Sequence, residues 1–284
     1  MAVVPPVSDP SQSAPRASRR PSRRAYLLIT VFALALVLLP FLFWHQTWFG
    51  RGLSEAEFDT KLADLSHPRQ AQHALVQIGE RIGRGDRSVR KWYPRIMELA
   101  SSPVIELRQT VAWIMGQDSS FEGFREPLRK LLADPEPTVR RNAALALSNF
   151  KDEAARAELR TMLRPSTLVS PASGTLRYRL KEAEYVNPGT LVARVGEVEV
   201  RAKLPGEIRS RSKPDGATVA AGEPLAELSA DREHAWEALR ALYSIGNRED
   251  LADVQRFARG IPGMPERLQQ QAVLTMRAIQ NRAP

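Results

Sequence analysis

Two stretches of this 284-residue chain carry the pattern that decides its fold: residues 106–118 read ELRQTVAWIMGQD, and residues 139–152 read VRRNAALALSNFKD. Both have apolar residues at the spacing of one helix face, which are Leu107, Val111, Ile114 and Met115 in the first and Ala143, Ala144, Ala146 and Leu147 in the second. Small residues on a buried face let neighbouring helices approach closely. Residues 70–81 and 234–250 share this pattern, so we expect four related helices.

Each of the last three helices follows another amphipathic stretch, so the sequence predicts a repeated helix pair. The preceding stretches are residues 90–100, 124–133 and 156–163. The period is regular, because Gly116 follows Gly79 by 37 positions and Asp152 follows Asp118 by 34. A helix pair that recurs at this period cannot bury its apolar face alone, and we expect the pairs to stack into a solenoid.

The segments SSPVIELRQTVAWIMGQD and ADPEPTVRRNAALALSNF resemble HEAT repeats of the short bacterial kind. The resemblance covers roughly residues 52–165 and 230–284. It implies an extended surface that binds a protein partner. An irregular bundle of amphipathic helices is the alternative.

Residues 166–229 change character and predict β structure. In TLRYRL, Leu176, Tyr178 and Leu180 alternate with arginines, as in a half-buried strand, and EVEVRA has the same alternation. The region is also an internal duplication, in which Gly174 corresponds to Gly206 and Gly189 to Gly222. We expect these four glycines to supply structural turns, with positive φ that other residues adopt only at a cost of about 1 kcal/mol or more.

This duplicated pattern resembles the barrel-sandwich hybrid of biotinyl and lipoyl carrier domains and of periplasmic adaptor, or membrane-fusion, proteins. In carriers the modified lysine lies in the turn between the two halves, which falls here near Val195 or Gly196, and neither is lysine. Lys203 lies beyond that turn. We therefore expect no biotin, lipoate or other cofactor. The long helical hairpin and the following β-barrel of adaptor proteins are also missing, so only the sandwich itself resembles an adaptor.

The β region interrupts the helical array within one helix pair. From Phe150 to Gly246 is 96 positions, and subtracting the 64 residues of the β region leaves 32, the length of one repeat. The predicted fold is therefore α+β and multidomain, an α-solenoid interrupted by a small all-β unit. Its expected segments are a basic tail (1–24), an apolar helix (25–44), repeats (52–165), the β unit (166–229) and further repeats (230–284).

The apolar stretch AYLLITVFALALVLLPFLFW, residues 25–44, predicts a transmembrane helix. Twenty residues at about 1.5 Å each span about 30 Å, the thickness of a hydrocarbon core. A cleaved signal peptide is the alternative, but its apolar core is shorter and ends in small residues. The preceding tail, residues 1–24, is poor in residues that a core could bury, and we expect it to be disordered.

Five arginines precede this helix and predict its orientation; they are Arg16, Arg19, Arg20, Arg23 and Arg24. On the other side only Arg51 lies close. The positive-inside rule therefore predicts a single-pass protein of the cytoplasmic membrane with its N-terminus inside and its soluble part outside, which is the periplasm in a Gram-negative bacterium.

No enzymatic chemistry is predicted. The chain has no cysteine, and its histidines, His45, His67, His73 and His234, stand in no metal-binding or catalytic motif. Of the net charge of +9, residues 1–24 carry +4, and the remaining +5 over 260 residues is too small a surplus to indicate nucleic-acid binding. We expect a non-enzymatic membrane-anchored scaffold or adaptor for protein partners. The alternatives are an accessory subunit of a transport or secretion complex and a biotin or lipoyl carrier, which the absent lysine disfavours.

Overall fold

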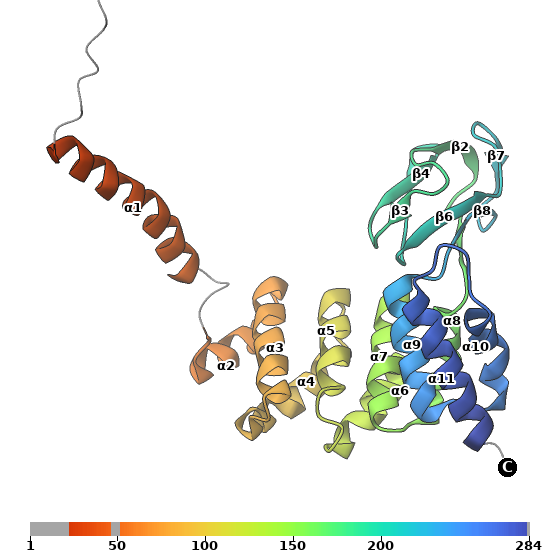
Figure 1. Ribbon diagram of the computed structural model, residues 1–284, viewed down its shortest axis with the longest axis horizontal. Helices are drawn as coiled ribbons and strands as arrows, with labels where there is room; N and C mark the ends of the chain where they lie inside the picture. Colours follow the sequence, from red (N-terminus) through yellow and green to blue (C-terminus); the bar gives the residue numbers. More distant parts are fainter. Residues whose placement is uncertain (1–22, 47–51, 283–284) are drawn as a thin grey trace, which may run out of the picture. The chain divides into compact units, whose positions relative to one another are not determined.

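The computed structural model describes residues 23–46 and 52–282, without the side chains of residue 25 and residues 43–46. It contains two compact units, Met1–Gly52 and Leu53–Pro284. Of the predicted disordered tail, residues 1–22 lie outside the described residues. Among the described residues, the first unit holds one helix, α1 (Arg23–Gln46), and the second holds the other elements (Figure 1).

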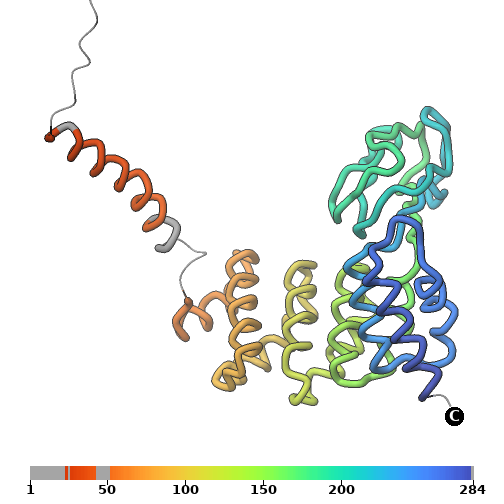
Figure 2. The backbone as a smooth tube through the Cα atoms, in the orientation of Figure 1, coloured from red at the N-terminus to blue at the C-terminus, as the bar shows by residue number. Residues whose placement is uncertain are grey.

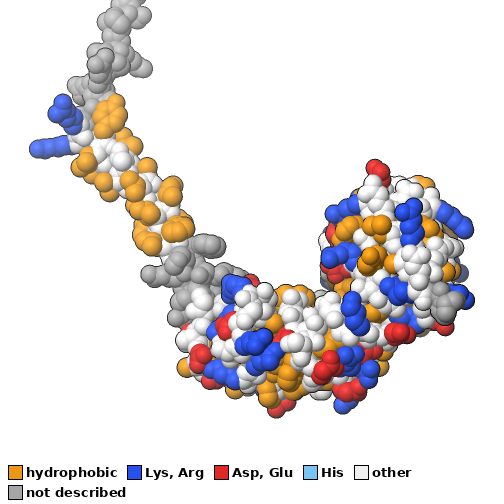
Figure 3. Space-filling view, turned by 60° about the horizontal axis from the view of Figure 1, so that its bottom comes forward, with side chains coloured by type: hydrophobic (Ala, Val, Ile, Leu, Met, Phe, Trp, Pro, Cys, Tyr) orange, Lys and Arg blue, Asp and Glu red, His pale blue; other side chains and the backbone are white. Residues whose placement is uncertain are grey.

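Helix α1 is 24 residues long and contains Pro40. Its described apolar side chains are exposed, from Tyr26 at 58% to Leu42 at 48%, and Figure 3 shows them covering the helix. Ala25, Phe43 and Trp44, the ends of the predicted span, are among the residues whose side chains are not described. Among the described residues, no helix is long and apolar enough to cross a membrane.

The second unit is built from five helix pairs, which confirms the predicted helical repeat. The pairs are α2 (Glu55–Ala63) with α3 (Pro68–Gly83), α4 (Tyr93–Leu99) with α5 (Ile105–Met115), α6 (Arg125–Leu131) with α7 (Pro137–Asn149), α8 (Arg156–Met162) with α9 (Arg232–Ile245), and α10 (Leu251–Ala258) with α11 (Glu266–Arg282). The second helices of the pairs pack side by side in the order α3, α5, α7, α9, α11 (Figure 1). We call this row the B row, and the first helices the A row.

Short 3₁₀ turns lead into four of the A-row helices: η1 (Arg87–Trp92), η2 (Glu122–Phe124), η3 (Glu153–Ala155) and η4 (Arg248–Asp250). Polar side chains cap three of them, because Asp86, Asp152 and Asn247 accept hydrogen bonds from backbone N–H groups at their starts. Such caps satisfy donors that have no partner within the helix. Each turn thus fixes where the next pair begins.

One hydrophobic core runs through the whole helical array, from Phe58 in α2 to Ile279 in α11. It includes residues on both sides of the β region, such as Leu159 in α8 and Leu239 in α9. Helices α8 and α9 contact each other although 69 positions separate their facing ends (Figure 2). The array therefore continues from α8 to α9 across the β region.

Residues 166–229, hereafter the β module, form two antiparallel four-stranded sheets. The strands are β1 (Ser166–Val169), β2 (Gly174–Tyr178), β3 (Tyr185–Val186), β4 (Leu191–Val195), β5 (Val198–Arg201), β6 (Gly206–Arg211), β7 (Thr218–Val219) and β8 (Pro224–Leu228). The sheet orders are β1-β8-β6-β3 and β5-β4-β2-β7. A separate core fills the module, with Leu176, Val192, Ile208 and Leu225 among its buried residues. Helical array and antiparallel β module together confirm the α+β class.

Candidate interaction surfaces

The B row carries a groove across the C-terminal halves of α5, α7 and α9, with a volume of about 680 Å³. Trp113 of α5 lines it and is 40% exposed, while the opposite wall includes Glu237 and Arg240 of α9. Asn142 and Asn149 of α7 donate hydrogen bonds at 3.1 Å each to the backbone carbonyls of Gln109 in α5 and of Gly116, its C-cap. These amides tie α7 to α5 along the floor of the groove. A large, partly exposed aromatic among polar groups is typical of a protein-binding surface.

Close helix packing fixes the position of Trp113. A Cβ on Gly79 of α3 would lie 2.5 Å from the Trp113 ring, so the indole packs on bare backbone there. A Cβ on Gly116 would likewise lie 2.8 Å from the Cβ of Ala146 in α7. The two glycines let consecutive B-row helices approach closely. The groove therefore depends on the same small residues that the sequence pattern singled out.

Arginine–aspartate contacts join consecutive repeats on the side of the 3₁₀ turns. Asp118 accepts hydrogen bonds from Arg90 and Tyr93 at 2.9 Å each. Asp152, one repeat later, accepts from Arg129 at 2.8 Å and from Arg125 at 3.3 Å. Each carboxylate lies in the segment that leads from a B-row helix into the next repeat, and it binds side chains of the repeat before it, from η1 and α4 for Asp118 and from α6 for Asp152. These contacts fix the angle at which the repeats stack.

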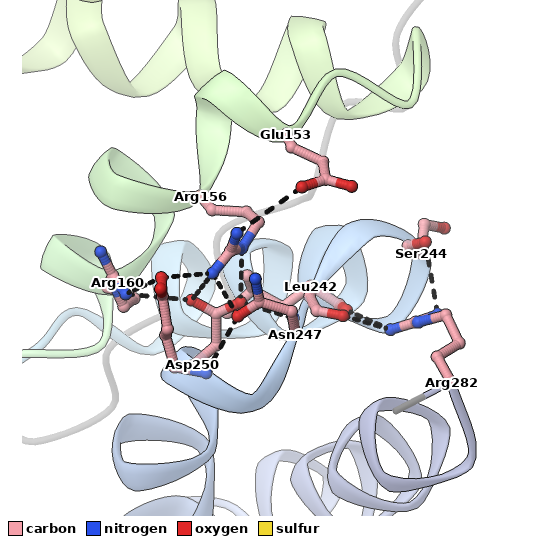
Figure 4. A network of polar contacts seen from close by, with 10 residues as sticks. Glu153, Arg156, Arg160, Leu242, Ser244, Asn247, Asp250 and Arg282 are labelled. Carbon is pink, nitrogen blue, oxygen red and sulfur yellow. Dashed lines mark hydrogen bonds and ion pairs between the residues drawn. The ribbon is translucent and has the colours of Figure 1, made fainter. Parts of the chain in front are cut away.

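The same kind of contact links α8 to the last helix pair (Figure 4). The Arg156 Nε lies 2.8 Å from Oδ2 of Asp250, and the same guanidinium also bonds Asn247 and Glu249. The Asp250 side chain is fully buried. Arg282 of α11 donates to carbonyl oxygens at the end of α9, including that of Gly246 at 3.0 Å. Buried polar contacts thus hold the fifth pair onto the fourth.

The carboxylates of Asp118 and Asp152 stay ionised at neutral pH. Burial alone would raise the pKa of Asp118, but hydrogen bonds from Ser120, Tyr93 and Arg90 hold it below its usual range. The pKa of Asp152 is lowered in the same way, because bonds from the Ala154 N–H and from Arg129 outweigh its burial. Burial and the bond to Asp118 raise the pKa of Tyr93 to about 12. Tyr93 is therefore a neutral donor at any ordinary pH.

The β module is seated on the helical array by two side-chain contacts. The Tyr185 hydroxyl donates to Asp231 at 2.7 Å, and Lys203 lies 3.0 Å from Glu136 at the start of α7. Asp231 also caps α9 by accepting from the His234 N–H at 2.9 Å. Burial would raise the pKa of Asp231, but hydrogen bonds from His234 and Tyr185 hold it well below its usual range. A charged cap of α9 therefore also holds the module.

The turn between β4 and β5 consists of Gly196 and Glu197. This is the position at which the resemblance to carrier domains places the modified lysine, and no lysine is present. Lys203 lies after β5 and is bound to Glu136. The fold therefore offers no attachment point at the expected turn.

The paired glycines lie at equivalent turns of the two halves. Gly189 has φ of 86° and Gly222 has φ of 84°. Their N–H groups donate to the carbonyls of Ala202 and Ser170, respectively. Gly174, at φ of 157°, begins β2. Gly206 has no positive φ, in contrast to the expectation, and a close approach explains it: a Cβ there would lie 2.5 Å from the Ser229 carbonyl oxygen.

The three histidines whose side chains are described, His67, His73 and His234, form no common site. His67 is exposed and lies 2.8 Å from Asp64. His73 is half-buried in α3, where burial lowers its pKa. His234 lies at the start of α9, while the side chain of His45 is outside the described part of the chain. Within the described residues, no group of histidine or acidic side chains could hold a metal ion.

The predicted topology determinants are placed in part. Arg23 and Arg24 are exposed at the start of α1. Arg16, Arg19 and Arg20 lie outside the described residues. The orientation that these arginines predict therefore remains a prediction.

Comparison with known proteins addresses the helical array. A family model for HEAT repeats matches residues 93–169. The helical part of the chain is HEAT-like. No curated protein matches the chain. A solved engineered protein from a structural genomics consortium covers 80% of the chain and is itself covered to 80%, at 15% identity and a TM-score of 0.43. HEAT repeats are typical of protein-interaction scaffolds, with binding surfaces along stacked helices.

Proposed function

We propose that this protein is a non-enzymatic scaffold, anchored to the cytoplasmic membrane by its apolar segment 25–44, that binds a protein partner in the B-row groove. The observation that carries the proposal is the groove itself, in which Trp113 is held on Gly79 and remains 40% exposed. An exposed tryptophan fixed by close packing is already ordered, so little conformational entropy is lost on binding.

The membrane anchor is supported by the sequence and by the exposed apolar surface of α1. Residues 25–44 contain no charged residue, and the preceding arginines favour an N-terminus in the cytoplasm. The soluble unit is then periplasmic in a Gram-negative bacterium. The β module is proposed as an inserted, unmodified barrel-sandwich hybrid, supported by the duplicated turns at Gly189 and Gly222.

A role as accessory subunit of a transport or secretion complex is the second candidate, and the resemblance of the β module to adaptor sandwiches favours it. It differs from a general scaffold in the partner, which would be a membrane transporter. A carrier role is disfavoured because Gly196 and Glu197 occupy the turn between β4 and β5.

Replacing Trp113 with a photo-crosslinking amino acid tests the proposed groove. In its own host, the full-length protein should give one discrete crosslinked product upon irradiation, which mass spectrometry would identify as a second protein. Glu126 of α6 is a suitable control position, because its side chain is 69% exposed on the A row. Crosslinks of equal yield from both positions, or none from Trp113, would contradict binding in the groove.

The orientation has its own test. A reporter that is active only in the cytoplasm, fused after Pro284, should be inactive, and one that is active only outside should be active. Replacing the five arginines by glutamate should reduce or invert insertion, because the positive-inside bias is then lost. Strong cytoplasmic activity with the arginines intact would exclude the proposed topology.

A further inference from the structure

The β module has open edges at β1 and β5. Strand β5 pairs only with β4, and β1 only with β8, among the described strands. Just beyond β5, the Ala202 N–H donates to Thr190 and the Ala202 carbonyl accepts from Gly189. Because backbone groups alternate in direction along a strand, those of Glu199 and Arg201 point away from β4. The β5 edge thus presents unpaired donors and acceptors.

A groove of about 480 Å³ lies between these two edges. The side chains that point into the module line it, including Leu168 of β1, Val200 of β5 and Leu228 of β8. Pro137, the first residue of α7, closes it on the side of the helical array. The groove is therefore apolar and reaches from the module edge to the helices. A strand added to β5 would place every second side chain in it.

The outer face beside this edge carries an excess of positive charge. Glu199 is the acidic residue of β5, and it is already paired with Arg194 at 2.9 Å and Arg201 at 2.6 Å. Arg177 of β2 lies directly opposite Arg194 in the ladder. Like charges in that position destabilise a sheet. Arg194 and Arg201 share the one carboxylate of Glu199, so a net positive charge remains beside the β5 edge.

The other sheet does not share this excess. Its exposed Arg209 is paired with Glu227 at 3.1 Å. Lys213, which follows β6, lies 3.6 Å from Glu223. The unbalanced charge is therefore specific to the sheet that ends in β5.

We propose that β5 binds an extended segment of a partner protein by strand addition, and that this segment alternates acidic and apolar residues. Its apolar side chains would fill the groove beside Val200, and its carboxylates would lie on the outer face beside Arg201. The inference rests on the proposed scaffold function and gives the β module a partner of its own. A second copy of this chain is disfavoured, because two β5 edges would bring their arginines together.

Titration with two synthetic heptapeptides tests this inference on the full-length protein in detergent micelles. One peptide alternates glutamate and valine, and the other has lysine in place of glutamate. The glutamate peptide should bind with at least about a tenfold higher affinity, since its carboxylates meet Arg201 and the net positive charge of this face, which would repel the lysine peptide. Equal affinity for the two peptides would overturn the proposed charge complementarity.

Variants of the edge separate strand addition from general charge attraction. Arg201→Glu should weaken binding of the glutamate peptide about tenfold. Arg201→Pro should abolish it, because the N–H of residue 201 points away from β4 and proline removes it without breaking the existing ladder. Arg177→Glu is the matched control. Arg177 lies two strand spacings, about 10 Å, from β5, so this variant should change the affinity for the glutamate peptide by less than about twofold.

Each variant must have the same melting temperature as the parent, measured by circular dichroism, so that a loss of binding does not reflect unfolding. Equal losses from Arg177→Glu and Arg201→Glu would mean diffuse attraction to any anionic surface and would overturn the proposal. Dimerisation that Arg201→Pro abolishes, detected by light scattering, would instead identify a second copy as the occupant. A negative result here with an intact Trp113 crosslink would refute the edge site and leave the helical groove standing.

Discussion

Asp250→Ala should destabilise the helical array by about 3–5 kcal/mol, the range measured when one partner of a buried ion pair is removed. The Asp250 side chain is fully buried, accepts a hydrogen bond from the Asn247 N–H at 2.8 Å and holds Arg156, whose side chain is only 11% exposed. Removing the carboxylate takes the buried partner of the Arg156 guanidinium away and leaves the Asn247 N–H without its acceptor. For an array of this size the melting temperature should fall by roughly 10 °C.

Glu249→Ala is the matched control, because Glu249 also contacts Arg156, at 2.8 Å, but is 69% exposed. An exposed ion pair contributes less than about 1 kcal/mol, so this variant should melt within a few degrees of the parent. Asp250→Asn should be intermediate, since an amide oxygen can still accept the hydrogen bond from the Asn247 N–H. Thermal unfolding followed at 222 nm measures all three. Equal falls in melting temperature for Asp250→Ala and Glu249→Ala would show that burial does not increase the contribution of the ion pair to stability.

The helix pairs could be predicted because their apolar residues recur at helical spacing. The apolar positions that predicted helices in residues 106–118 and 139–152, such as Val111 and Ala143, are fully buried in the structure. The last pair was not delineated, because Gly260, Pro262 and Gly263 interrupt the pattern between α10 and α11. Boundaries also shifted: α9 ends at Ile245, and Arg248–Asp250 begins the next repeat.

The arginine–aspartate ion pairs of Asp118, Asp152 and Asp250 were not predicted, although part of their signal is present in the sequence. Asp118 and Asp152 were noticed as markers of the repeat, but their partners come from the preceding A row, for example Arg129, which lies 23 positions before Asp152. A search for arginine in each A-row helix before an aspartate would have found them. Asp250 gives no such signal, because the β module separates it from Arg156 by 94 positions.

In the β module, too, the local features could be predicted from the sequence, whereas the features that depend on strand pairing could not. Alternation predicted strands around Leu176 and Val200, and the duplication predicted equivalent turns at Gly189 and Gly222. The open edge of β5 could not be predicted, because it depends on which strands pair. The charge excess around Arg194 depends in turn on register, since a shift of one residue would move its side chain to the other face.

Deleting residues 166–229 and joining Pro165 to Ala230 through a short Gly/Ser turn should leave a folded helical array. Ser166 and Leu228, at the two ends of the module, are cross-strand partners, which places their Cα atoms about 5 Å apart. A short turn can therefore replace 64 residues. The helical core runs without interruption from α8 to α9, and it shares no residue with the core of the module.

The shortened protein loses the contacts of Tyr185 and Lys203 with the array, and we expect a fall of only a few degrees in melting temperature. Lys203 is 64% exposed, so its ion pair contributes little. Asp231 loses one hydrogen bond but still caps α9 through the His234 N–H. Deleting α9 instead, residues 232–245, should abolish the cooperative helical transition, because Leu239 and Leu242 belong to the continuous core. Loss of the helical signal in the first deletion, comparable to that in the second, would show that the array needs the β module to fold.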